Sequence, residues 1–160
     1  MKKIIILASA SVASGILFAN IYNSMVNAAA VESNIPTSIV AAREYFSTVN
    51  PGDFFKVFSP LSQLLALLSL VLFWKRSPAI RLLLGIAFLC YFAADIFAFT
   101  YFHPRNDIMY NSETLPDTET LKRVAAEWSS MNWVRSLVLL IGVVCSFLAI
   151  DKIYTRKESL

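Results

Sequence analysis

The sequence predicts an all-α protein built as a bundle of four transmembrane helices. Hydrophobic residues make up 57% of the 160 residues and charged residues only 16%, which is far more apolar than an ordinary soluble domain. Apolar tracts, each close to the length that a helix needs to cross a bilayer, occupy residues 4–22, 57–74, 82–102 and 134–150. We therefore predict a single integral membrane domain over residues 1–160.

The first tract, residues 4–22, has two interpretations. Basic residues at its start and the small residues 27–30 after it also resemble a secretory signal, which would be removed near Val31. The apolar run is long for a signal core, so we favour a retained helix.

The connection from 23 to 56 is predicted to be ordered and to serve as a lid or binding element, because structureless loops longer than about 15 residues are uncommon. After Pro36, the sequence IVAAREYFSTV is typical of a short amphipathic helix. The turn formers at 50–52 end this helix before the second tract begins.

The third tract is predicted to stop at Pro104, because a proline disfavours the helical conformation of the residue before it. A second outer loop then covers residues 103–132. Within it, Asp117 is a plausible N-cap for a new helix. Neither proline nor glycine follows until Gly142, so this fourth helix is expected to reach about Tyr154 and to extend beyond the membrane.

The basic residues predict the orientation of the bundle. The link 75–81 carries three basic residues and no acid, and both ends of the chain are also basic, whereas most acids lie in the two longer connections. Because basic residues concentrate on the cytoplasmic side, we expect both termini to be cytoplasmic. The short chain with its Met-Lys-Lys start suggests the inner (cytoplasmic) membrane of a bacterium.

A polar stripe enters the fourth tract. Trp128, Asn132 and Arg135 are spaced i, i+4 and i+7, so a helix presents them on one face. An unpaired charge in hydrocarbon costs several kcal/mol, and Asp95, the only acid in the third tract, lies at a similar depth. The two residues form either a purely structural ion pair or a pair in which Arg135 offers spare donors to a ligand.

Further polar residues gather where the third tract ends. His103 is a candidate general base, although a lone histidine at a helix end is also typical of a surface residue. Asn106 and Asp107 are equally compatible with satisfying backbone groups at a turn. The single histidine and the lack of a C-x-x-C pair predict no metal and no cofactor. The scattered basic residues give no support for nucleic-acid binding.

Three segments, NPGDFFKVFSPL, FHPRNDIM and EWSSMNWVRSL, resemble in their order and placement the anthrone-oxygenase-like family of small four-helix membrane proteins. By position, the pattern falls on Asn50, Pro51, Pro104, Asn106, Asp107, Trp128, Asn132 and Arg135. The resemblance implies oxygenation of an anthrone to an anthraquinone without a metal or flavin. Such a reaction needs a base to form an enolate and donors to stabilise an oxyanion.

The resemblance and the polar residues together give a candidate site. The candidate catalytic residues are His103, Asp107 and Arg135, the candidate substrate-binding residues are Asn50, Asn106, Trp128 and Asn132, and the candidate structural ion pair is Asp95 with Arg135. His103 or Asp107 would be the base.

Two functions follow as hypotheses. The first is cofactor-independent oxygenation of an aromatic or lipophilic small molecule that enters from the outer leaflet. The alternative is a non-catalytic protein that binds a ligand, assists a transporter or serves as a scaffold for a partner. The expected partners are membrane lipids and the small molecule, and the sequence leaves the oligomeric state open, a homo-oligomer included.

Overall fold

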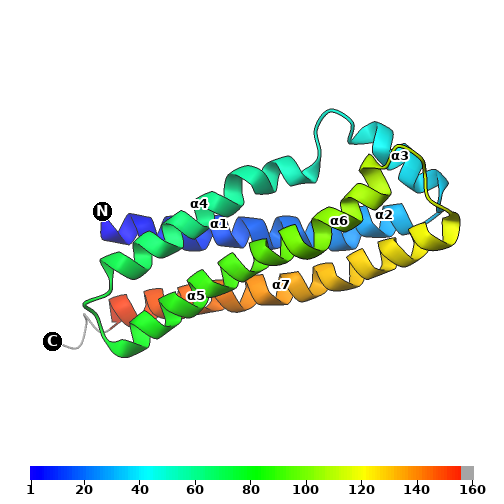
Figure 1. Cartoon of the computed structure of the whole chain (residues 1–160). Coiled ribbons are helices and arrows are strands. Elements are labelled where there is room, and N and C mark those ends of the chain that lie inside the picture. Colours follow the sequence, from blue (N-terminus) through cyan, green and yellow to red (C-terminus); the bar gives the residue numbers. More distant parts are fainter. Residues whose placement is uncertain (156–160) are drawn as a thin grey trace.

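The structure, a computed structural model, describes residues 1–155 and confirms the all-α prediction (Figure 1). Four of its helices are long and apolar enough to cross a membrane. The first comprises α1 (Lys2–Tyr22), the π-helical turn η1 (Asn23–Ala28) and α2 (Ala29–Glu32), and the second is α4 (Pro51–Leu72). The third comprises α5 (Pro78–Phe97), the π-helical turn η2 (Ala98–Phe102), α6 (His103–Asn106) and the π-helical turn η3 (Asp107–Asn111). The fourth is α7 (Thr118–Thr155). A short helix, α3 (Thr37–Tyr45), lies in the first connection, as expected.

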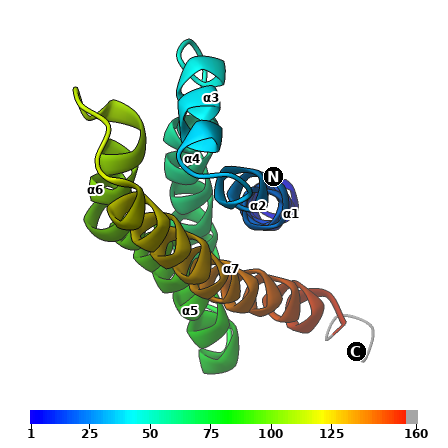
Figure 2. The same cartoon turned by 90° about the vertical axis from the view of Figure 1, so that its right-hand side faces the viewer.

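The four long helices form a ring in which α1 contacts α4 and α7, and α5 contacts the same two helices (Figures 1 and 2). Sequential neighbours are therefore antiparallel, as in an up-down-up-down bundle. The start of α1 and the end of α7 lie together, where Lys3 Nζ is 5.3 Å from the Tyr154 ring centroid. We call this the terminal end of the bundle, and the opposite end, which carries α3, the loop end.

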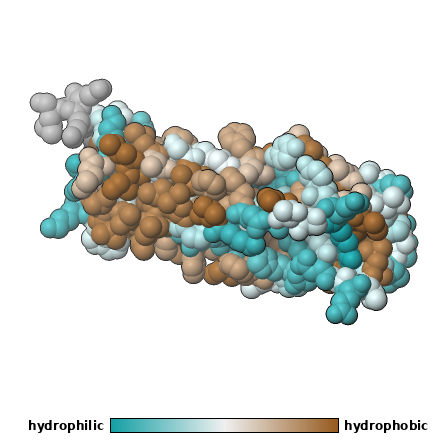
Figure 3. Space-filling view, turned by 90° about the horizontal axis from the view of Figure 1, so that it is seen from above, coloured by the Kyte–Doolittle hydropathy of each residue, from teal (hydrophilic) through white to brown (hydrophobic). Residues whose placement is uncertain are grey.

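One face of the bundle divides into an apolar and a polar half. On the face shown in Figure 3, apolar side chains predominate in the half nearer the terminal end, whereas hydrophilic side chains gather toward the loop end. Inside, many contacts are made by small or polar residues, among them Ser9, Ser62, Ser69 and Ser146. Lipid tails are as apolar as leucine, so helices in a membrane associate through close backbone approach and hydrogen bonds.

The second helix begins earlier than its apolar tract. Asn50 is its N-cap: Asn50 Oδ1 accepts a hydrogen bond from the Gly52 backbone N–H at 2.8 Å, and Asp53 Oδ2 accepts one from the Asn50 N–H at 3.0 Å. Pro51 occupies the first helical position, where its missing N–H costs nothing. The predicted turn at 50–52 is thus the first turn of α4, held by a capping box.

The prediction that Pro104 ends the third helix is wrong, because the chain stays helical through Asn111. Pro104 lies two residues after the end of the π-helical turn η2, and such a turn accommodates a residue that cannot take part in the regular i→i−4 ladder. One residue further on, Arg105 Nη1 donates a hydrogen bond to the Tyr101 carbonyl at 3.1 Å. Most of the expected second loop is therefore helix, and only residues 112–117 link α7 to it.

The fourth helix matches its prediction closely. Asp117 Oδ1 accepts a hydrogen bond from the Thr120 backbone N–H at 3.0 Å, which lowers the pKa of the exposed Asp117 carboxyl below its usual value. The 38 residues of α7 make a rod of roughly 57 Å at about 1.5 Å per residue. It exceeds the thickness of a bilayer core, so one end projects beyond the hydrocarbon.

Contact between α5 and α7 depends on Gly142. A Cβ atom at this position would lie 2.6 Å from Tyr91 Cε1 and 3.0 Å from Cys90 Cβ. The Tyr91 ring has little freedom to move, because it is buried and its hydroxyl shares a 2.9 Å hydrogen bond with Ser146 Oγ. Glycine is therefore required here for close packing.

Replacing Gly142 with alanine should lower the free energy of unfolding by about 1–3 kcal/mol, the usual cost of overpacking a tight core. Thermal unfolding in mild detergent would measure it. Gly85→Ala is the matched control, because a Cβ at Gly85 meets nothing within 4 Å. Equal melting of both variants and the wild type would show that Tyr91 yields freely.

Candidate functional site

A buried arginine lies where the four long helices meet. Arg135 on α7 is only 6% exposed, and its Nη1 donates a hydrogen bond to Asn20 Oδ1 on α1 at 3.1 Å. Its Nη2 lies 3.7 Å from Asp95 Oδ1 on α5. Asp95 in turn accepts a 2.5 Å hydrogen bond from Gln63 Nε2 on α4. Each long helix thus contributes one member, and we call Asn20, Gln63, Asp95 and Arg135 the polar centre.

Two aromatic rings cover the guanidinium. The Arg135 Cζ atom is 4.8 Å from the Phe55 ring centroid and 5.9 Å from that of Phe102. Aromatic faces attract a cation, and the attraction grows when water is excluded, so the rings help to offset the cost of burying this charge. Arg135 Nε is also buried, yet it has no hydrogen-bond partner.

Trp128 lies two turns earlier on the same face of α7. Its ring packs edge-on against Phe102, with 5.5 Å between the centroids, and its Nε1 is buried without a hydrogen-bond partner. Across residues 1–155, Trp128 Nε1 and Arg135 Nε are the only buried side-chain nitrogen or oxygen atoms that have no hydrogen-bond partner. Both belong to residues that contact the ring of Phe102, so two unused N–H donors flank one aromatic side chain.

The third residue of the stripe, Asn132, pairs with the first helix. Asn20 Nδ2 donates to the Asn132 carbonyl and to Ser136 Oγ, while Asn132 Nδ2 donates to the Asn20 carbonyl and to Ser24 Oγ. The two helices therefore exchange equivalent hydrogen bonds from one Asn-x-x-x-Ser segment to the other. We call these four residues the asparagine clasp.

Four further residues around Arg135 and Asn132 were not predicted from the sequence: Asn20, Ser24, Phe55 and Phe102. For the first two a signal existed, since polar residues recur at 20, 23, 24 and 27 in an apolar tract, with the same Asn-x-x-x-Ser spacing as at 132–136. Nothing in the local pattern distinguishes the two phenylalanines from lipid-facing ones. Their role depends on which way each helix turns.

The structure does not bring His103 or Asp107 to the polar centre. His103 is exposed, and its ring contacts that of the exposed Phe99 at 4.9 Å. Asp107 is also exposed and accepts a hydrogen bond from Asn111 Nδ2 at 2.8 Å, and Asn106 beside it is partly buried. The catalytic roles of His103 and Asp107 stay predictions.

A separate ion pair joins the third and fourth helices toward the loop end. Arg105 Nη2 lies 2.7 Å from Glu127 Oε2, and the guanidinium stacks 3.5 Å from the Tyr101 ring centroid. Both partners are partly exposed, so this pair contributes little to stability. Within residues 1–155, no group of three His, Cys, Asp or Glu side chains is placed to hold a metal ion.

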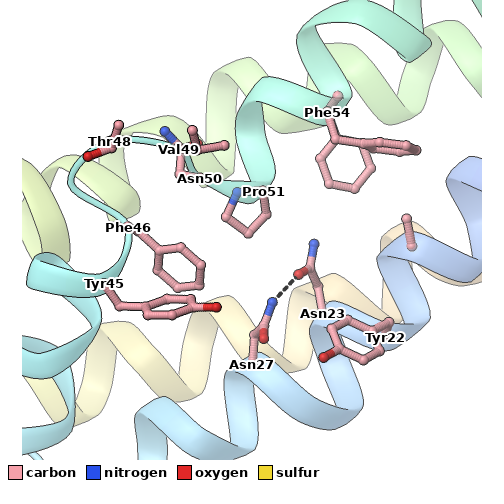
Figure 4. A pocket seen from close by; sticks show the side chains of 12 residues that line it. Tyr22, Asn23, Asn27, Tyr45, Phe46, Thr48, Val49, Asn50, Pro51 and Phe54 are labelled. Atoms are coloured by element: carbon pink, nitrogen blue, oxygen red, sulfur yellow. Dashed lines mark hydrogen bonds between the residues drawn. The ribbon is translucent and has the colours of Figure 1, made fainter.

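A pocket of about 620 Å³ opens between the end of α1, the link 45–50 and the start of α4 (Figure 4). Asn23 and Asn27 lie on one side of it, and Tyr45 and Phe46 lie across from them. Asn50, a predicted substrate-binding residue, also lines the pocket. So does Phe55, whose ring covers Arg135, and the pocket therefore borders the polar centre.

If the asparagine clasp stabilises the fold, Asn20→Ala and Asn132→Ala should each lower the free energy of unfolding by about 1–3 kcal/mol, since hydrogen bonds between membrane helices contribute about 0.6–1.7 kcal/mol each. The double variant Asn20→Ala, Ser136→Ala should lose less than the losses of its two single variants added together, because both substitutions remove the hydrogen bond from Asn20 Nδ2 to Ser136 Oγ. Denaturation in mixed micelles would give the cycle.

The matched control is Ser14→Ala, which removes only a hydrogen bond to the Ala10 carbonyl within α1. Strictly additive losses for Asn20 and Ser136, or no loss of stability in Asn132→Ala, would contradict the clasp.

Comparison with known proteins bears on the same residues. The family model described as anthrone oxygenase matches residues 53–145, more than half of the chain. The matched range includes Asp95, Phe102, Trp128 and Arg135. No curated protein and no solved structure matches the chain. The extent of the family match, together with four membrane-spanning helices, shows that this chain belongs to the anthrone oxygenase family.

Proposed function

We propose that this membrane protein oxygenates a neutral, lipophilic aromatic molecule without a resident cofactor. Family membership supports the reaction class. The observation that carries the proposal is the pair of buried, unused N–H donors, Trp128 Nε1 and Arg135 Nε, on either side of Phe102. Buried donors without a partner are costly, so their presence at a functional site suggests that a ligand uses them.

The chemistry balances with dioxygen as the only co-reactant. A base removes a proton from a methylene carbon that is activated by aryl rings and a conjugated carbonyl, which gives an enolate. The enolate carbon transfers electrons to dioxygen and forms a C–O bond, and protonation gives a hydroperoxide. Loss of water then leaves a second carbonyl, so that R₂CH₂ and O₂ become R₂C=O and H₂O. Two electrons from each C–H bond reduce the oxygen.

The residues near Arg135 suit the first step. Negative charge moves onto the carbonyl oxygen as the enolate forms, and preorganised N–H donors in a site without water stabilise that charge strongly. Trp128 Nε1 and Arg135 Nε supply such donors. The Asp95 carboxylate, held by Arg135 and Gln63, is the base that we propose in place of His103 or Asp107, because it is part of the polar centre.

We also infer the orientation of the bundle. The terminal end carries the basic link 75–81 and the basic start of the chain, so it faces the cytoplasm, in a bacterium across the inner membrane. The loop end and the pocket then lie toward the outer leaflet, from which a lipophilic molecule reaches them without crossing the bilayer.

A second candidate function, binding of a ligand without catalysis, is favoured by the pocket between α1 and α4, whose lining includes none of the candidate bases Asp95, His103 and Asp107. Mass spectrometry of the protein purified in mild detergent separates the two functions. A retained aromatic molecule that stays unaltered in air supports binding alone, whereas conversion to an oxygenated product supports the enzyme.

Removing one donor gives a direct test. Trp128→Phe keeps a ring against Phe102 but lacks the N–H, so kcat for oxygen uptake with an anthrone should fall on the order of 100-fold with little change in KM. An oxygen electrode would measure both constants. Trp133→Phe is the matched control, because Trp133 is 49% exposed on the outer surface of α7 and should keep wild-type rates. Equal rates for the two variants would remove Trp128 from the mechanism.

The identity of the base is tested separately. Asp95→Asn should reduce oxygen uptake by about 100-fold or more, whereas His103→Ala and Asp107→Ala should stay within about twofold of wild type. Loss of activity in His103→Ala, with Asp95→Asn active, would reverse the assignment. The double variant Asp95→Asn, Arg135→Gln removes both charges and should regain thermal stability without regaining activity, which separates catalysis from folding.

A further inference from the structure

The pocket beside the polar centre is built mostly from outside the range that the family model matches. Ten of its twelve lining residues precede residue 53, and only Phe54 and Phe55 fall within 53–145. The residues around Arg135, in contrast, lie mainly inside that range. The pocket and the polar centre therefore come from different parts of the chain.

The lining of the pocket selects for a neutral molecule. None of the twelve lining residues carries a charge, and five are aromatic: Tyr22, Tyr45, Phe46, Phe54 and Phe55. A phosphate headgroup or another anion would need a cation that this wall does not offer. The aromatic residues offer flat faces and edges for stacking against a planar ring system.

An amide pair supplies hydrogen bonding on one wall. Asn27 Nδ2 donates to Asn23 Oδ1 at 2.5 Å, and no other hydrogen bond among residues 1–155 engages the side-chain atoms Asn23 Nδ2 and Asn27 Oδ1. Both asparagines belong to the π-helical turn η1, and such turns are frequent at functional sites. The free donors and acceptor suit a carbonyl or hydroxyl group at the edge of a ring.

The size and position of the pocket agree with a bound small molecule. Its volume of about 620 Å³ lies within the usual range for ligand sites, roughly 300–1,000 Å³. The start of α4 diverges from α1, and the pocket lies in the angle between them (Figures 1 and 4). Phe55 forms a wall shared with Arg135, so a molecule held in the pocket needs only to pass or displace this ring to reach the polar centre.

We propose that this pocket is the selectivity site for the substrate: it takes a neutral, planar aromatic molecule whose edge carries a carbonyl or hydroxyl group, recognised by Asn23 and Asn27. The inference rests on the proposed function for the reaction, but it is tested by binding alone.

Equilibrium binding of two probes to the full chain in lipid nanodiscs tests the proposal. The probes are 1,8-dihydroxyanthraquinone and anthracene, which share a three-ring shape but differ in edge oxygens. Asn27→Leu should raise the Kd of the quinone about tenfold, the effect of one lost hydrogen-bonding group, and leave that of anthracene unchanged. Asn111→Leu, an equivalent change at an exposed asparagine outside the pocket, should alter neither Kd.

A second variant, Val49→Trp, keeps the proposal testable if Asn27→Leu does not fold. Val49→Trp places a large ring at the pocket from the link before α4, where the side chain is exposed, and should weaken binding of both probes. Val40→Trp, exposed on α3 and outside the pocket, is its control. The proposal is overturned if Asn27→Leu and Val49→Trp both bind the quinone as the wild type does. It is also overturned if the wild type binds neither probe and holds only phospholipid.

The two proposals fail in different ways. Quinone binding that depends on Asn27, in a wild-type protein that consumes no oxygen with an anthrone, keeps the pocket and removes the oxygenase. Oxygen uptake that depends on Trp128, with binding insensitive to Asn27 and Val49, keeps the oxygenase and removes the pocket.

Discussion

The burial of one positive charge organises this bundle. A guanidinium within the hydrocarbon is tolerated only when it has partners, and Arg135 finds them on the other three long helices, either directly or through Asp95. These contacts constrain the depth of α1 and α5 relative to α7 directly, and that of α4 through Asp95. Apolar packing does not set the relative positions of the helices in the same way, because an apolar helix face packs about as well against lipid tails as against another helix. The same requirement that holds the helices together therefore concentrates polar groups at one level of the membrane.

The first helix is an integral part of this arrangement. Asn20 accepts a hydrogen bond from Arg135 and completes the asparagine clasp with Asn132. Without that helix, both residues on α7 would lose their main uncharged partners and would face lipid or water. Cleavage near Val31, the alternative that the sequence leaves open, would leave Arg135 supported by Asp95 and two aromatic rings alone.

Much of the fold could be predicted from the sequence, because hydropathy and caps are local properties. The four tracts and both ends of α7 follow from residue type alone, and counting residues from the helix ends brings Asp95 and Arg135 to one depth, where the structure has them 3.7 Å apart. Helix rotation was not predictable in the same way. Whether His103 or Phe102 turns inward depends on one π-helical turn, and the sequence alone showed only a proline that appeared to end the helix.

That π-helical turn has a geometric consequence for the part of the third long helix that follows it, α6 and η3. A π-helical turn accommodates about one more residue than an α-helical turn, and one residue corresponds to about 100° of rotation about the helix axis. The residues before η2 and those after it therefore follow two different helical phases along one continuous rod. The phase change lets Phe102 reach Trp128 and Arg135 while His103 points outward. In homologous chains, a single-residue deletion in this segment would leave the helix long enough to cross the membrane. It would nevertheless rotate the residues that follow, and so change which side chains face the polar centre.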